Sequence, residues 1–124
     1  MKKVITTANA PQAIGPYSQA IETNGRLYVS GQIPVDPENG TMPSGIVLQT
    51  EQVLRNIGAI LSAAGYTFDH VVKTTVLMKN MSDFAAMNEV YARYFTTEMP
   101  ARACFEVSAL PKNAEVEIEV IAEK

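Results

Sequence analysis

Apolar and polar residues alternate along several short stretches of the chain, whereas along two longer stretches the apolar residues recur every three or four positions. Alternation with many β-branched residues predicts strands, and the wider spacing predicts amphipathic helices. Six strands are expected, at Val4–Thr6, Tyr17–Thr23, Arg26–Ile33, Val71–Lys79, Ala101–Ser108 and Glu115–Ala122. Asn24-Gly25, between the second and third strands, is typical of a two-residue hairpin turn.

Two amphipathic helices are expected between the later strands. The first runs from about Leu48 to Ala64, and Gly65 is expected to end it in a left-handed conformation. Its apolar stripe consists of Val53, Leu54, Ile57, Ile60, Leu61 and Ala64. The second is expected to begin with Ser82 as its N-terminal cap and to end before Pro100. Its stripe consists of Phe84, Met87, Tyr91 and Phe95.

The predicted order is β-β-β-α-β-α-β-β, an α+β fold in which both helices can cover one face of a single sheet. A length of 124 residues and a mass of 13.5 kDa predict that residues 1–124 form a single domain. Residues expected beneath the helices in the last two strands are Ala101, Ala103, Phe105, Val107, Val116, Ile118, Val120 and Ala122. The alternate positions carry an arginine, a thiol and a ladder of carboxylates, which are expected on the other face.

The last two strands are predicted to pair as an antiparallel hairpin through the turn at Leu110–Asn113. In that register Arg102 lies opposite Glu119, and Cys104 lies opposite Glu117, all on one face. Glu117 is then within diagonal reach of Arg102. The spacing leaves two interpretations open: an exposed ion pair of little energetic consequence, or a pair that is used in binding or catalysis.

Composition narrows the possible functions. The net charge of −3 and a pI near 5.1 leave no basic surplus for the phosphates of a nucleic acid. No apolar run is long enough to span a membrane or to form the core of a signal peptide. The single cysteine, Cys104, excludes an internal disulfide, and the single histidine, His70, excludes the usual zinc ligand sets. A reducing, cytoplasmic location is expected, without a metal, membrane or nucleic-acid partner.

Several further positions are candidates for a site. Cys104 has three interpretations: a small buried apolar residue, a nucleophile or part of a pocket wall. Asn88 lies on the apolar stripe of the second helix, so its amide needs a partner, either a structural hydrogen bond in the core or a ligand. Gly15-Pro16-Tyr17 directs an aromatic ring, and Ser30-Gly31 brings a hydroxyl and an unobstructed backbone to a strand end. Either of these two segments is also compatible with an ordinary turn.

Six motifs are distributed along the chain. They are Ile14-Gly15-Pro16-Tyr17-Ser18-Gln19, Ser30-Gly31-Gln32-Ile33-Pro34, Asn88-Glu89-Val90-Tyr91, Pro100-Ala101-Arg102 through Glu106-Val107, Leu110-Pro111 and Val116-Glu117-Ile118-Glu119. In this order and at these separations they resemble the Rid (RidA/YjgF) family of reactive-intermediate deaminases. The combination of Pro-Ala-Arg-x-Cys with Leu-Pro and Val-Glu-Ile-Glu is highly specific. Phe105 is bulkier than the valine or isoleucine expected at its position in the family.

The resemblance implies a chorismate-mutase-like fold and a homotrimer whose three sheets face inward, with active sites between subunits. It implies hydrolysis of reactive 2-imino acids and their enamine tautomers to 2-oxo acids and ammonia. The implied substrates are 2-aminoacrylate, 2-iminopropanoate and 2-iminobutanoate, whose removal protects pyridoxal-phosphate enzymes from damage. Neither a metal nor an organic cofactor is implied.

The resemblance also implies a role for each candidate residue. Arg102 and Glu117 are the implied catalytic residues: Arg102 holds the substrate carboxylate with two parallel hydrogen bonds, and Glu117 accepts a proton from the attacking water. The implied substrate-binding residues are Tyr17, Ser30, Gly31, Asn88, Arg102 and Cys104. Tyr17 closes over the substrate, Ser30 relays a proton, and Cys104 contributes pocket wall and backbone rather than a nucleophile.

A second interpretation is a binding protein without turnover, either a trimeric small-molecule regulator, for example in purine regulation, or a stress chaperone. The presence of both Arg102 and Glu117 favours the enzyme, because a sensor needs the arginine but not an acid that activates water. Ribonuclease activity, which is also attributed to parts of the family, is disfavoured by the net charge of −3 and by the absence of a second histidine.

Overall fold

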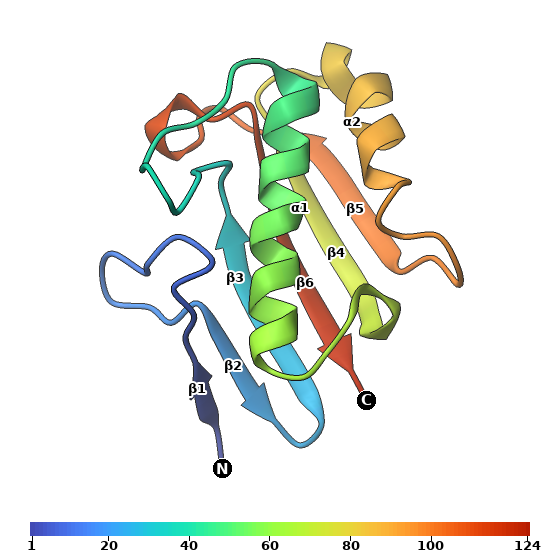
Figure 1. Ribbon diagram of the computed structural model, residues 1–124. Helices are drawn as coiled ribbons and strands as arrows, with labels where there is room; N and C mark the ends of the chain where they lie inside the picture. The colour runs from blue at the N-terminus through green and yellow to red at the C-terminus, as the bar shows by residue number, and fades with distance from the viewer.

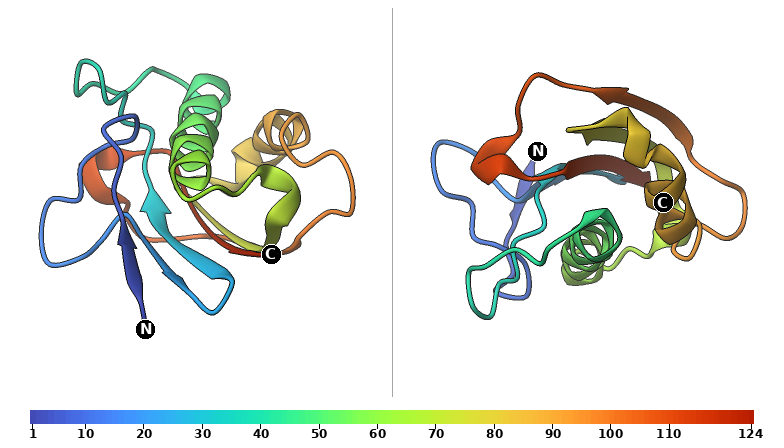
Figure 2. Two further views of the ribbon diagram at one scale, coloured as in Figure 1. Left: turned by 60° about the horizontal axis from the view of Figure 1, so that its bottom comes forward. Right: turned by 90° about the horizontal axis from the view of Figure 1, so that it is seen from above.

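Six strands form one mixed sheet, and both helices lie on one face of it (Figures 1 and 2). The computed structural model describes every residue from 1 to 124. The strands are β1 (Lys3–Ile5), β2 (Ala20–Thr23), β3 (Arg26–Gln32), β4 (Val71–Met78), β5 (Ala101–Glu106) and β6 (Val116–Glu123). The helices are α1 (Ile46–Ala63) and α2 (Phe84–Tyr91), with short 3-10 helices at Phe68–His70, Met81–Asp83 and Pro111–Asn113. The predicted α+β class and order of elements are confirmed.

The strands are arranged across the sheet in the order β1-β2-β3-β6-β4-β5. All neighbours are antiparallel except β4 and β5, which run parallel and are connected through α2. The C-terminal strand β6 therefore has a neighbour on each side (Figure 1). β2 and β3 form the predicted hairpin, in which Asn24 (φ 50°) and Gly25 (φ 75°) adopt left-handed conformations typical of its turn.

The predicted hairpin between the last two strands is wrong. β4 lies between β5 and β6, so Arg102 is paired in register with Thr74, and Glu117 is paired with Leu77. The segment 107–115 instead crosses the end of β4 to reach β6. A turn in the sequence shows that the chain reverses direction, but it does not show whether another strand lies between the two that it connects.

The apolar stripe of α1 packs on the sheet and supplies much of the core. Its almost fully buried residues are Val53, Leu54, Ile57, Ile60 and Leu61. α1 begins at Ile46, before the predicted start at Leu48, and ends at Ala63. Gly65 follows with a φ of 80°, which confirms the left-handed termination that the sequence predicted.

α2 is shorter than predicted. Ser82 lies within the 3-10 helix Met81–Asp83 and does not cap α2, which ends at Tyr91, well before Pro100. The predicted stripe is nevertheless buried at Met87, Tyr91 and Phe95. The Phe95 ring packs on the Tyr91 ring at a centroid distance of 4.5 Å, so aromatic contact continues where the helix does not.

Alternation along β6 divides its faces as predicted, because its alternate apolar residues are buried on the helix side. These are Val116, Ile118, Val120 and Ala122. Along β5 the predicted faces are reversed: Arg102 and Cys104 face α2, whereas Phe105 is 49% exposed on the opposite side. Alternation shows which residues share a face, but on an edge strand it does not show which face is covered.

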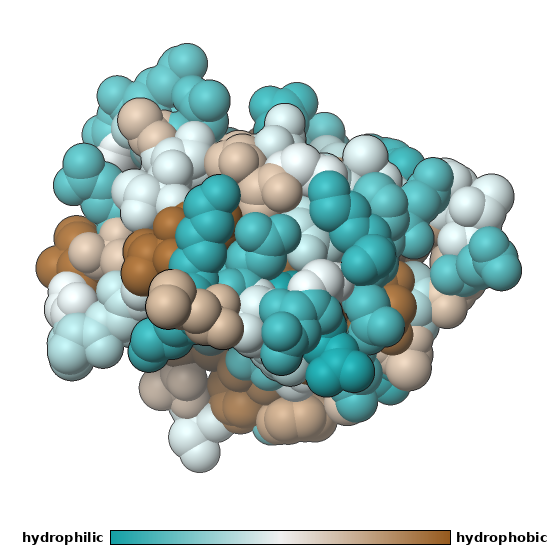
Figure 3. Space-filling model, turned by 90° about the horizontal axis from the view of Figure 1, so that it is seen from below, coloured by the Kyte–Doolittle hydropathy of each residue, from teal (hydrophilic) through white to brown (hydrophobic).

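No helix covers the second face of the sheet (Figure 2), which leaves apolar side chains exposed. Tyr28 on β3 and Phe105 on β5 project from this uncovered face. Seen from the end that carries both termini, apolar surface lies along the lower border, on the side away from the helices (Figure 3). Neither helix combines the length and the hydropathy that crossing a bilayer requires.

Candidate active site

Arg102 on β5 rests against three side chains of α2. Its Nη1 donates a hydrogen bond of 2.7 Å to Asn88 Oδ1, and its guanidinium carbon lies 4.8 Å from the centre of the Tyr91 ring and 5.5 Å from that of Phe84. Spacings of three and four residues place these α2 side chains on one helical face. Cation–π contact and the Asn88 bond restrain the guanidinium, which keeps further N–H donors free for a ligand.

Asn88 thus has a protein partner, but this partner is the exposed guanidinium of Arg102 and not a group in the core. The same bond places its amide next to a solvent-exposed guanidinium, so Asn88 also belongs to the surroundings of any ligand that Arg102 binds. Tyr91 was predicted as part of an apolar stripe and of the motif that begins at Asn88, but it was given no role in the site. Tyr91 carries a polar hydroxyl on an otherwise apolar stripe, and this feature could have indicated that it lies next to Arg102.

Cys104 lies on the same face of β5 as Arg102 and is partly buried against the core. Burial raises the pKa of its thiol, and the charge of Arg102 opposes that shift. A thiol with a raised pKa is a poor nucleophile at neutral pH. The single histidine is engaged elsewhere, since His70 Nδ1 accepts a hydrogen bond from the Thr67 N–H at 2.9 Å. The geometry favours the pocket-wall interpretation of Cys104.

Glu117 projects from β6 into the uncovered face. Its carboxylate lies against the backbone of Gly31, where a Cβ atom would overlap the carboxylate oxygen. Burial, and secondly the negative charge of Glu119, raises the pKa of Glu117. A half-buried carboxylate with an increased affinity for protons has the properties of a general base.

Ser30 precedes Gly31 at the end of β3, and Tyr17 lies in the loop before β2. Ser30 Oγ donates a hydrogen bond of 2.5 Å to the Ser18 carbonyl, so its lone pairs remain available to accept from a ligand. Tyr17 is 53% exposed and follows Gly15, whose φ of 119° turns the chain. Tyr17 and Ser30 both line a surface hollow of about 410 Å³.

Gln19 was missed by the sequence analysis, although it holds the loop that carries Tyr17. Its side-chain oxygen accepts from the Thr7 N–H at 2.7 Å, and its nitrogen donates to the carbonyls of Thr7 and Pro11 at 3.0 and 2.8 Å. Its place in the Gly-Pro-Tyr-Ser-Gln motif is the signal that could have identified it.

The candidate residues form two groups on opposite faces of the sheet. Arg102, Asn88 and Cys104 lie on the helix side, whereas Glu117 and Gly31 lie on the uncovered side. The predicted diagonal contact between Arg102 and Glu117 is therefore wrong within one chain, because β4 separates their strands and their side chains point in opposite directions. The structure contains no group of three His, Cys, Asp or Glu side chains that could hold a metal ion.

Comparison with known proteins agrees with this fold and these motifs. A family model described as Endoribonuclease L-PSP matches residues 7–124. The crystal structure of YyfA from Yersinia pestis, described as a member of the conserved Rid protein family, is 55% identical, with a TM-score of 0.97 over all of both chains. The chain belongs to the Rid family.

Two further Rid relatives bear on the function. A mouse protein named 2-iminobutanoate/2-iminopropanoate deaminase is 51% identical over 98% of this chain and 91% of its own length. Escherichia coli TdcF, whose crystal structure contains bound serine, is 41% identical, with a TM-score of 0.95 over 98% of each chain. Both similarities cover nearly the full length of this protein.

Proposed function

We propose that this protein hydrolyses reactive 2-imino acids to 2-oxo acids and ammonia, with 2-iminobutanoate and 2-iminopropanoate as substrates and 2-aminoacrylate as the enamine form of the latter. The observation that carries the proposal is the full-length similarity, at 51% identity, to a mouse protein named for this reaction. The chemical properties of Arg102 and Glu117 support it independently.

Arg102 binds the substrate carboxylate. A guanidinium presents parallel N–H donors that match the two oxygens of a carboxylate, and the charge makes these bonds strong. The aromatic rings and Asn88 restrain the guanidinium before the substrate arrives, so less conformational entropy is lost on binding. The carboxylate adjoins the imine carbon, so this contact also fixes the position of the reacting atom.

Glu117 removes a proton from the attacking water. The water oxygen forms a bond to C2 of the protonated imine, the C=N π electrons move to nitrogen, and Glu117 takes the water proton. Glu117 then returns that proton to the nitrogen of the tetrahedral intermediate. The C–N bond breaks as the hydroxyl oxygen forms the C=O bond, and ammonia leaves. The hydroxyl proton passes to the Glu117 carboxylate, which gives the 2-oxo acid, and Glu117 then releases the proton to the ammonia.

The remaining candidates surround the reacting atoms. Ser30 Oγ, whose O–H donates a hydrogen bond to the Ser18 carbonyl, accepts a hydrogen bond from the imine nitrogen and relays a proton during conversion of enamine to imine. The backbone at Gly31 and Cys104 donates to the substrate, and Tyr17 closes over it. None of these steps requires an organic cofactor or a metal.

Each site requires two subunits, because Arg102 and Glu117 point to opposite faces of one chain. A homotrimer with its sheets facing inward covers the exposed apolar side chains of Tyr28 and Phe105. It also brings the edge strand β5 of one subunit towards the uncovered face of the next. The active sites then lie at the subunit interfaces.

The biological role that fits this chemistry is protection. Enamines and imines released by pyridoxal-phosphate enzymes in the cytoplasm react with other enzymes of that class, and their hydrolysis prevents the damage. The test is direct: threonine dehydratase generates 2-iminobutanoate in place, and release of 2-oxobutanoate is followed with and without this protein. Faster release is expected, and an unchanged rate with folded protein would overturn the proposal.

Ligand binding without turnover is the alternative, and the serine bound to TdcF, a relative at 41% identity, favours it as a second candidate. The two functions differ in their need for Glu117. Replacing Glu117 with glutamine is expected to lower turnover strongly while carboxylate binding by Arg102 persists. A regulator would show carboxylate binding in the wild-type protein with no acceleration of imine hydrolysis.

A further inference from the structure

A buried pair of hydroxyl groups lies next to Arg102. Thr74 is completely buried on β4, in register with Arg102 on the parallel strand β5. Its Oγ1 lies 2.8 Å from the phenol oxygen of Tyr91, which is 7% exposed. The Tyr91 ring is the closer of the two aromatic rings on which the Arg102 guanidinium rests.

The hydroxyl pair restrains the ring on which the guanidinium lies. A tyrosine ring rotates about two side-chain bonds, and a hydrogen bond at its tip limits that rotation. Phe95 packs against the Tyr91 ring with a centroid distance of 4.5 Å, so the ring is held from a second direction. Arg102 itself is exposed on an edge strand, where a long side chain otherwise samples many rotamers.

We propose that Thr74 and Tyr91 are positioning residues, which orient the Arg102 guanidinium for a substrate carboxylate. This inference rests on the proposed imine hydrolysis, because it assigns Arg102 the role of carboxylate clamp. Neither hydroxyl touches the reacting atoms. The contact with the carboxylate is made in the substrate complex and in the transition state alike, so its loss raises KM and leaves kcat nearly unchanged.

A purely structural role for the same hydrogen bond predicts a different pattern. Removing one hydroxyl leaves the other buried without a partner, which destabilises the fold. Removing both at once, with side chains of nearly the same shape, can restore stability. If the single variants lose affinity for a carboxylate only because they are less stable, the double variant regains that affinity together with its stability. If the hydroxyl pair positions Arg102, the double variant regains stability but still binds a carboxylate weakly.

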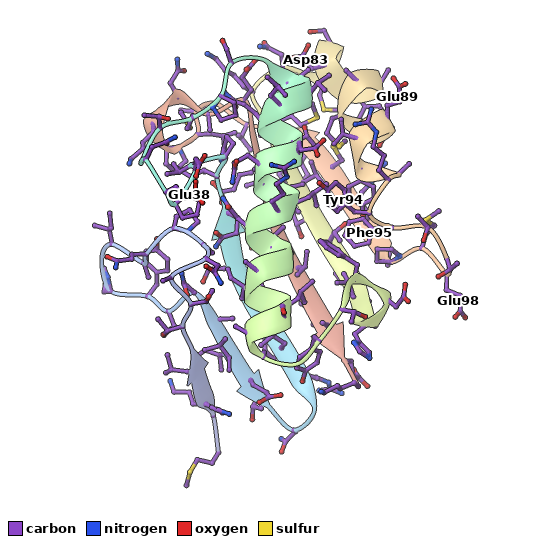
Figure 4. The ribbon with its side chains drawn as sticks, viewed as in Figure 1. Glu38, Asp83, Glu89, Tyr94, Phe95 and Glu98 are labelled. Carbon is purple, nitrogen blue, oxygen red and sulfur yellow. The ribbon has the colours of Figure 1, made fainter.

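The experiment compares Thr74→Val, Tyr91→Phe and the double variant with the wild-type protein. Tyr94→Phe is the matched control, because Tyr94 lies beside α1, where its ring packs on Phe68 rather than on Arg102 (Figure 4). Melting temperature, kcat, KM and the Kd for 2-oxobutanoate are measured for each. The product 2-oxobutanoate carries the same carboxylate as the substrate, so its Kd reports on Arg102 without requiring turnover.

The two single variants are expected to melt earlier, and the double variant is expected to melt close to the wild type. KM and Kd are expected to rise about 5- to 10-fold in all three, with kcat within about 3-fold of the wild type. Tyr94→Phe is expected to keep the wild-type Kd.

Wild-type affinity for 2-oxobutanoate in a folded double variant would overturn the positioning role. Binding of 2-oxobutanoate by Arg102→Ala as tight as that of the wild type would also overturn it. Absence of imine turnover in the wild type would instead overturn the proposed function, and the Kd series would still decide the positioning role.

Discussion

Glu117 differs from the other carboxylates of its strand by its surroundings. It is half-buried, its carboxylate lies against the Gly31 backbone, and Glu119 is close enough to raise its pKa. Glu115, immediately before the same strand, is not among the atoms next to Gly31. The surroundings of Glu117 therefore identify it as the candidate base, whereas the pattern of glutamates at alternate positions does not distinguish it.

Replacing Glu117 with glutamine keeps the shape of the side chain and removes its ability to accept a proton. Turnover of enzymatically generated 2-iminobutanoate is expected to fall by roughly 10²-fold or more. Glu115→Gln is the matched control and is expected to retain nearly wild-type kcat. Equal losses in both variants would show that the carboxylate ladder acts as a structural unit or that another acid is the base.

The raised pKa of Glu117 also predicts a dependence of stability on pH. The folded protein binds the Glu117 proton more tightly than the unfolded chain, so ionisation of this group costs stability as the pH rises through its folded-state pKa. Glu117→Gln is therefore expected to melt at a higher temperature than the wild type at pH 7. The difference is expected to vanish near about pH 3, where Glu117 is protonated in both states. A lower melting temperature of the variant at pH 7 would contradict this account.

Arg102 is expected to depend on its planar fork as well as on its charge. Lysine offers a single mobile ammonium, so Arg102→Lys loses the paired hydrogen bonds while the net charge is unchanged. Its kcat/KM is expected to fall by about 10- to 100-fold, and Arg102→Ala is expected to be worse. Both variants should stay folded, because the guanidinium is exposed. A near-wild-type rate for folded Arg102→Lys would show that charge alone suffices.

At the scale of elements, the end of β3 brings Gly31 and Glu117 together. The register between β3 and β6 shifts between Val29 and Gln32, so the regular ladder is interrupted where Ser30 and Gly31 lie. Such an irregularity redirects side chains next to a site. The absence of a side chain at Gly31 is what lets the Glu117 carboxylate lie against the backbone there.

Gly31→Ala is therefore expected to displace the Glu117 carboxylate without unfolding the sheet, since the end of a flexible side chain can move aside. Turnover is expected to fall at least about 10-fold with a nearly unchanged circular dichroism spectrum. The double variant Gly31→Ala/Glu117→Gln should lose little more than Glu117→Gln alone, because both changes act on one carboxylate. Fully additive losses of turnover in the double variant would show that Gly31 does not act through Glu117.

At the scale of the whole molecule, one chain presents the residues of the proposed site in two separate groups. The helix side carries the arginine, and the uncovered side carries the carboxylate and exposed apolar residues such as Phe105. In a closed ring of identical subunits, every interface brings the helix side of one subunit next to the uncovered face of its neighbour, so one type of contact is repeated around the ring. By light scattering, a species of about three times 13.5 kDa is therefore expected.

Subunit mixing tests this arrangement. Arg102→Ala and Glu117→Gln are each expected to be inactive, but a site formed by the intact Glu117 of one variant and the intact Arg102 of the other is complete. After denaturation and refolding of an equal mixture, about a quarter of the sites in random trimers hold both residues, so about a quarter of the wild-type activity should return. If trimers form in the mixture but no activity returns, Arg102 and Glu117 of each site come from the same subunit.

The sequence by itself determined the elements and the identities of the candidate residues. Period-two and period-3.6 patterns depend on local backbone geometry, so the strands, both helices, the Asn24-Gly25 turn and the end of α1 at Gly65 could be predicted. Helix ends were predicted less well. Ser82 lies in a separate 3-10 turn and does not cap α2. α2 ends at Tyr91 and passes into a further turn, in which the Phe95 N–H still donates to the Tyr91 carbonyl, and the apolar stripe does not show where such a change occurs.

Only the tertiary structure decided how these residues are brought together. The insertion of β6 between β3 and β4 depends on long-range pairing, which no turn between consecutive strands specifies. That order separates Arg102 from Glu117, and the packing of α2 over β5 selects the face on which Arg102 lies. Alternation relates neighbours on one strand, whereas a site is formed by residues on different strands and helices. Their relative positions therefore depend on the packing of the whole sheet.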